Sequence, residues 1–292
     1  MRIGLSVLLV ACLIGSAGAQ QISYVTTIQP FRAILQEVVG SRARVHALLP
    51  PGASPHTHHL RPSDVRAAQE ATALFIGGRG LDDWASELPC PRRVVFLGLL
   101  PQDSLLHMNN KHRTKQGEHQ HAHGDVDPHF WTDPLAVRAL LPALVDSLCA
   151  FDPAGCILYR TAAARFAARL DSLTEAIALT LDKARGSRVL LAHPFFNYFL
   201  RRFGIEVVGT VEVAAGSEPS ARVLQRLSRE ATASGARALF THPQLPDRAA
   251  RVVAESAGIP FHQLDPIGGS EGRFTYEELL WYNTRILARV LR

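Results

Sequence analysis

The sequence predicts an α/β protein of two lobes, each with a mainly parallel sheet and flanking helices, joined by one long rigid backbone helix. Three observations support this fold class. Short apolar or β-branched runs alternate with helical patterns in both halves of the chain. An uninterrupted helical pattern separates the two halves. The length of 292 residues suits about two domains better than one core.

Residues 1–19 are predicted to be a secretory signal peptide. Arg2 precedes an apolar stretch, and small residues follow it up to an A-x-A pattern that ends at Ala19. The apolar stretch is shorter than the roughly 20 residues that span a membrane. Residues 20–292 would then be exported to the periplasm. The alternative is a lipoprotein signal, because Leu9 to Cys12 resembles a lipobox in which Cys12 is acylated.

The first lobe is expected over residues 20–152 and the second over residues 186–292. In the first lobe the patterns predict strands at 22–26, 44–49, 73–76 and 93–97, and helices at 30–39 and 62–70. In the second lobe they predict strands at 189–192, 206–211, 238–241 and 260–264, and helices at 194–203, 221–234, 247–257 and 276–291.

The segment 153–185 is predicted to be the linking helix. It is rich in Ala, Leu and Arg, has no Gly or Pro after Gly155, and is followed by a stop signal at Gly186. Just before and within it, Cys149 and Cys156 flank a turn-rich segment. An oxidising compartment would allow a local disulfide between them, and two buried thiols are the alternative.

The composition narrows the function classes. The net charge of +5 comes from Lys and Arg that are scattered singly or in pairs, so we expect no nucleic-acid partner. Nine of the 13 histidines lie between His56 and His129, which calls for a chemical explanation. Imidazole is a good ligand for borderline cations such as Zn²⁺.

The first group of histidines lies in a polar loop at 107–125. This loop has almost no apolar residues, and we expect it to collect metal ions at low affinity through its imidazoles. A solvated polar loop is the alternative. The histidines of this loop are His107, His112, His119, His121 and His123.

A second group stands where predicted strands end or helices begin. It comprises His56, His129, His193 and Asp265. In open α/β sheets ligands bind at the carboxyl ends of the strands, so these side chains are candidate metal ligands, two from each lobe. His58, His59 and His242 are candidate accessory residues or residues that orient the ligands.

Several segments together resemble the zinc and manganese substrate-binding proteins of ABC transporters, the cluster A-I or ZnuA/TroA-like family. The resemblance runs in order from Ile22 to Leu291. It rests on PPGASPHTHHLRPSDV, ALFIGGRGLDDW, the His-rich loop, DPHFWTDP, HPFFNYFLRRFGIEVVG, EPSARVLQRL and LDPIGG.

The resemblance implies that His56, His129, His193 and Asp265 hold one metal ion between the lobes, for delivery to the membrane subunits of an ABC permease. Histidine at 193 favours Zn²⁺ over Mn²⁺, which is content with oxygen ligands. Two departures from the family pattern are present. His242 stands where an acidic residue is common in the family. A histidine next to His56 could replace His56 as a ligand.

Three imidazoles and one carboxylate complete a tetrahedral zinc shell with no open position for an activated water. We therefore expect a monomeric carrier and no enzyme. Two alternatives remain: a periplasmic zinc chaperone or buffer without its own permease, and a zinc hydrolase with Asp265 as base, which no H-E-x-x-H motif supports.

Overall fold

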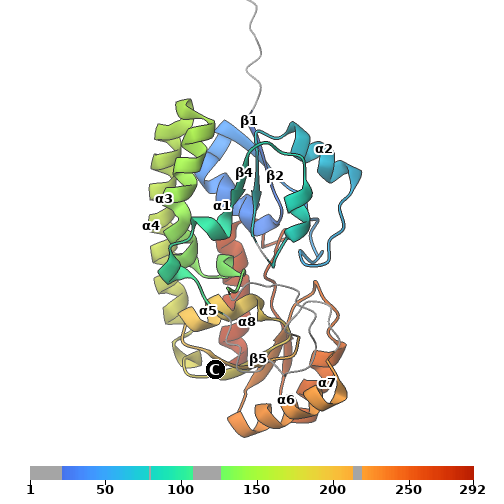
Figure 1. Cartoon of the computed structure of the whole chain (residues 1–292). Coiled ribbons are helices and arrows are strands. Elements are labelled where there is room, and N and C mark those ends of the chain that lie inside the picture. The colour runs from blue at the N-terminus through green and yellow to red at the C-terminus, as the bar shows by residue number, and fades with distance from the viewer. Residues whose placement is uncertain (1–21, 79, 108–125, 213–218) are drawn as a thin grey trace, which may run out of the picture.

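The computed structural model describes residues 22–78, 80–107, 126–212 and 219–292. Within these residues the chain forms two α/β lobes, one above the other in Figure 1. Each lobe has one four-stranded sheet in which every pairing is parallel. The expected fold class is confirmed.

The first lobe has the strand order β2-β1-β3-β4. Thr26 at the end of β1 lies opposite Ala47 of β2 and Phe75 of β3, so the carboxyl ends of these strands share one edge. Proline near the first helical position starts both flanking helices. The elements are β1 (Ile22–Thr26), α1 (Gln29–Val39), β2 (Ala43–Ala47), α2 (Pro62–Glu70), β3 (Ala73–Ile76) and β4 (Arg93–Val95).

The second lobe repeats this topology, with the order β6-β5-β7-β8. Gly235 and Gly258 end two of its helices in the left-handed region, where glycine carries no steric penalty. The elements are β5 (Arg188–Leu191), α5 (Asn197–Arg202), β6 (Glu206–Thr210), α6 (Ala221–Ser234), β7 (Ala238–Thr241), α7 (Arg248–Ala257), β8 (Phe261–Gln263) and α8 (Tyr276–Val290).

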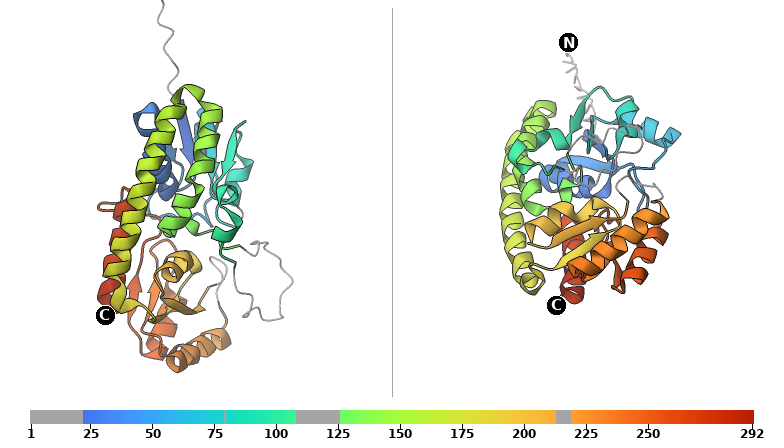
Figure 2. Two further views of the ribbon diagram at one scale, coloured as in Figure 1. Left: turned by 90° about the vertical axis from the view of Figure 1, so that its left-hand side faces the viewer. Right: turned by 60° about the horizontal axis from the view of Figure 1, so that its bottom comes forward.

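The linking helix α4 covers Cys156–Thr180 and is shorter than the expected range 153–185. Its flanks are separate 3₁₀ turns at Pro153–Gly155 and Asp182–Ala184. Asp152 ends the preceding helix, and Pro153 begins a tight turn that lets the chain reverse. Figure 2 shows α4 running along both lobes.

A further long helix, α3 (Pro134–Phe151), was not among the elements expected from the sequence. It is apolar and long enough to cross a membrane by composition, yet it packs along α4 and buries eight residues. Cys149 near its end forms a disulfide with Cys156 at the start of α4, with Cα atoms 4.8 Å apart. The disulfide interpretation is therefore confirmed.

One apolar cluster extends through both lobes. Tyr24 and Phe75 of the first sheet and Val189 and Phe240 of the second all belong to it, together with the inner faces of α3, α4 and α8. The alternate strand residues, such as Leu74 and Leu239, face two smaller clusters that each belong to one lobe. The lobes are thus packed on a common core.

Candidate metal centre

Three histidines from distant parts of the chain meet at the junction of the lobes. His56 follows β2, His129 precedes the 3₁₀ turn Phe130–Thr132, and His193 follows β5. One ring nitrogen of each lies within 4.8 Å of the others. The three rings are 5.0 to 5.4 Å apart between centroids. This set can hold a metal ion.

The spacing of one pair of these nitrogens suits zinc. Nε2 of His56 lies 3.2 Å from Nε2 of His129. Two nitrogens that bind one tetrahedral Zn²⁺ at about 2.05 Å are separated by about 3.3 Å. The two histidines of the first lobe are therefore placed as neighbouring ligands of one ion.

His129 is held in one orientation by Asp127. Nδ1 of His129 lies 2.7 Å from Oδ1 of Asp127, and the His129 amide donates to the same oxygen. The other oxygen of this fully buried carboxylate accepts from Asn197 of the second lobe at 2.9 Å. A carboxylate that holds Nδ1 fixes the tautomer and leaves Nε2 as the metal-binding atom.

His193 is almost completely buried, and neither of its ring nitrogens makes a hydrogen bond of ordinary geometry among the described residues. Burial lowers the pKa of His193 well below its usual value, and His129 and His56 lower it further. The ring is thus neutral, which is the form that binds metal. A buried, neutral imidazole beside two others indicates a position for a cation.

Asp265 is not part of this cluster of three in the structure. It follows β8, as expected, and is 5% exposed. Oδ1 accepts from Gln244 at 2.9 Å, and Oδ2 forms an ion pair with Arg273 at 3.1 Å. The carboxylate is therefore at the correct sheet edge but has other partners.

The accessory candidates also lie outside the cluster. His242 packs on Phe195 with ring centroids 4.2 Å apart, and burial lowers the pKa of His242 to about 3. His58 pairs with Asp64 at 3.0 Å and lies over Trp84, while His59 is exposed. His242 thus lies beside the cluster, whereas His58 is paired with residues of the first lobe.

The described residues that flank the His-rich segment lie beside the site. His107 forms an antiparallel bridge with Val126, and the amide of the next residue, Asp127, donates to Leu106. The other histidines of the expected loop, His112, His119, His121 and His123, lie outside the described residues, as do the predicted signal peptide and Cys12.

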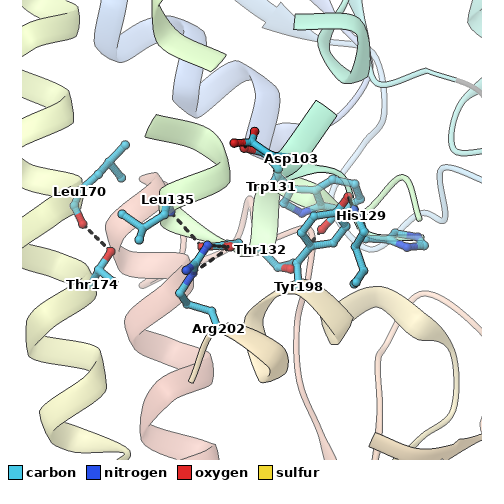
Figure 3. A network of polar contacts seen from close by, with 12 residues as sticks. Asp103, His129, Trp131, Thr132, Leu135, Leu170, Thr174, Tyr198 and Arg202 are labelled. Carbon is cyan, nitrogen blue, oxygen red and sulfur yellow. Dashed lines mark hydrogen bonds and ion pairs between the residues drawn. The ribbon is translucent and has the colours of Figure 1, made fainter. Parts of the chain in front are cut away.

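Side chains of α5 and of the segment after His129 join the two lobes around the site. Figure 3 shows Tyr198 and Arg202 reaching the segment that carries His129 and Trp131. Tyr198 donates to the carbonyl of Asp127 at 3.1 Å. From the first lobe, Nε1 of Trp131 donates to the Pro266 carbonyl at 2.8 Å. The histidines therefore lie at a junction where hydrogen bonds connect the two lobes.

Two parallel α/β lobes on a common core, a long helix along both and a histidine cluster between them define a two-lobed metal-binding protein of the helical-backbone type. The comparison with known families agrees with this class. Residues 25–290 match the family described as zinc-uptake complex component A, periplasmic, and the chain belongs to that family.

Among its relatives is the high-affinity zinc uptake system protein ZnuA of Paracoccus denitrificans, 28% identical over 94% of both chains. The periplasmic zinc-binding protein TroA of Treponema pallidum has a similar fold, with a TM-score of 0.78, 20% identity and coverage of 93% of this chain and 99% of that one. FpvC of Pseudomonas aeruginosa, solved with Mn²⁺, has a TM-score of 0.78, 24% identity and coverage of 93% and 98%.

Sequence reasoning did not single out four residues that shape the site: Asp127, Phe195, Asn197 and Arg273. Phe195 packs on the rings of His129 and His193, with both centroid distances 4.6 Å. Asp127 stands two residues before His129 in the DPHFWTDP region, where a carboxylate beside a candidate ligand is a usable signal. Arg273 gave no such signal because its partner lies across a loop.

Proposed function

We propose that this chain is a periplasmic zinc-binding protein that captures Zn²⁺ between its lobes and delivers it to an ABC-type permease. The observation that carries the proposal is the meeting of three imidazole nitrogens within 4.8 Å at the lobe junction. Imidazoles favour Zn²⁺ over Mn²⁺. The signal peptide predicted over residues 1–19 would direct export, and acylation of Cys12 as a lipid anchor is the alternative.

Asp265 is proposed as the fourth ligand, through Oδ2. With His56, His129 and His193 it would close a tetrahedral shell and leave no site for an activated water. A closed shell suits a carrier that acts as a monomer and carries out no chemistry on its cargo. Because both lobes supply ligands, occupancy would alter the junction, and a permease could distinguish loaded from empty protein.

Competition titration with a chromophoric chelator tests the proposal. Residues 20–292, purified without a histidine tag, should bind one tight equivalent of Zn²⁺ and bind Mn²⁺ much more weakly. His193→Ala should weaken zinc binding by about a hundredfold or more, because it removes a ligand from the shell. His46→Ala is the matched control, since His46 is an exposed strand residue outside the cluster. Equal zinc affinities for the two variants would contradict the assignment of His193 as a zinc ligand.

Delivery needs a separate experiment. Cells that lack this chain should take up zinc more slowly under chelator starvation, and the wild-type gene should restore uptake. The His193→Ala protein should not restore it. Normal uptake without the chain would favour a zinc buffer or chaperone.

A further inference from the structure

Asp265 is fixed by its backbone to the end of the second sheet. Its amide donates to Oδ1 of Asn283 at 2.7 Å, and Nδ2 of Asn283 donates to its carbonyl at 2.7 Å. Asn283 lies in α8 and is fully buried. The backbone of Asp265 is therefore held in place, and the partners of its carboxylate are set by its side-chain contacts.

The two oxygens of this carboxylate have different surroundings. Oδ1 accepts three hydrogen bonds, from Nε2 of Gln244 and from the amides of Ile267 and Gly268, at 2.9 to 3.0 Å. Oδ2 faces Nε of Arg273 at 3.1 Å. Since Oδ1 is saturated, Oδ2 is the oxygen that a metal ion would take.

Arg273 is positioned by a tight loop, residues 266–274, which follows Asp265. The amide of Gly269 donates to the Arg273 carbonyl, and the Arg273 amide donates to Ser270, both at 2.9 Å. Gly268 has φ +67°, and a Cβ there would lie 2.7 Å from the Arg273 carbonyl. The guanidinium also lies over the ring of Tyr282, 4.3 Å from its centroid. The hydrogen bonds of the loop and the contact with Tyr282 thus hold Arg273 next to Asp265.

A guanidinium and a metal ion are both cations and would compete for Oδ2. We propose that Arg273 is a positioning residue that competes with zinc for Oδ2 of Asp265, and so limits how tightly and how long the site retains its ion. This inference rests on the proposed function. It makes the fourth ligand a reversible one.

The competition predicts a specific set of variants. Arg273→Gln should bind Zn²⁺ about tenfold more tightly than the wild type, with correspondingly slower release to a chelator. Asp265→Asn should weaken binding, and adding Arg273→Gln to Asp265→Asn should change nothing further. This last result separates competition for Oδ2 from a general effect of positive charge.

Arg251→Gln is the matched control. Arg251 also forms an ion pair with an aspartate of the same lobe, Asp247, and lies over an aromatic ring, that of Phe261. This variant loses the same charge and the same kinds of contact, with Asp247 and Phe261, which are not candidate metal ligands. Its zinc affinity and release rate should equal those of the wild type.

Unchanged or weaker zinc binding by Arg273→Gln would overturn the inference. The same is true if this substitution tightened binding equally in Asp265→Asn. If Arg273→Gln folds poorly, Tyr282→Leu removes the ring under the guanidinium and should tighten binding in the same direction by a smaller factor; no change would contradict the inference. A wild-type chain without a tight zinc site would refute the proposed function itself.

Discussion

Arg202 in the second lobe binds Asp133 in the first with two nitrogens, at 2.8 and 3.0 Å. The same carboxylate caps α3 by accepting from the Leu135 amide at 2.9 Å. Asp133 is 4% exposed, so removing these partners would leave a buried carboxylate without hydrogen bonds from Arg202. One side chain therefore both starts the longest helix of the first lobe and fastens that lobe to the second.

Arg202→Gln should lower the free energy of unfolding by about 1 to 3 kcal/mol, since it removes charge-assisted hydrogen bonds from a buried carboxylate. Thermal or denaturant unfolding measures this loss. Arg138→Gln is the control, because Arg138 pairs with Asp171 and both side chains are nearly half exposed. Equal stability of the two variants would show that the inter-lobe pair contributes no more than a surface pair.

Asp127→Asn should weaken zinc binding by about tenfold to a hundredfold, which is the usual effect of losing a carboxylate that orients a histidine ligand. The neutral amide no longer favours the tautomer with the proton on Nδ1 of His129. Chelator competition measures the affinity, and the visible spectrum of the Co²⁺ form reports the geometry of the shell. Asp146→Asn, an exposed position of α3, should leave both unchanged.

Asp152 gives the fold an acid-sensitive contact. Arg42, followed by Tyr159, lowers the pKa of Asp152 from its ordinary value of 3.8 to about 2. A carboxylate with a depressed pKa stabilises the folded state above its unfolded pKa, and this stabilisation is lost as the pH falls from about 4 through about 2. Asp152→Asn should therefore unfold more easily at pH 7 and show a flatter stability profile between pH 4 and 2.

The pH dependence of the stability of Asp152→Asn can be compared with that of Asp171→Asn, which alters an exposed ion pair. That control should follow the wild type across the whole range. A wild-type profile for Asp152→Asn would mean that the pair between Arg42 and Asp152 does not contribute to acid stability.

The disulfide can be removed with Cys149→Ser and Cys156→Ser together. The bridge closes a short chain segment, with a sequence separation of 7, so its loss should cost about 2 kcal/mol of stability by chain-entropy arguments. Zinc affinity should not change, since the bridge joins α3 to α4 outside the histidine cluster. Cys90→Ser, at the free cysteine, is the control; a comparable loss there would contradict this assignment.

The sequence predicted the strands well because their apolar runs are short and bounded by turns; β1, β3 and β7 begin and end at the expected residues. Helix α3 was missed for a physical reason. It buries the face toward the core and also packs along α4, so it is apolar around most of its circumference and lacks a clear helical period. Pro142 inside it further obscured the pattern.

The site was predicted in part. The expected grouping of His56, His129 and His193 agrees with the structure, which brings them together, although His129 opens a 3₁₀ turn and does not follow a named strand. The partners of Asp265 could not be predicted, because the ion pair with Arg273 depends on how the 266–274 loop folds back. Side-chain pairing across an irregular loop has no periodicity for a sequence to reveal.

The common apolar core has a consequence for how the molecule comes apart. Residues of both sheets, such as Phe75 and Phe240, share one cluster with α4 and α8, so neither lobe keeps a complete interior when the other unfolds. Melting should be a single cooperative event in calorimetry, with equal van't Hoff and calorimetric enthalpies. A metal ion held at the junction would then protect the entire chain, and its saturation could be followed as one shift of the melting temperature.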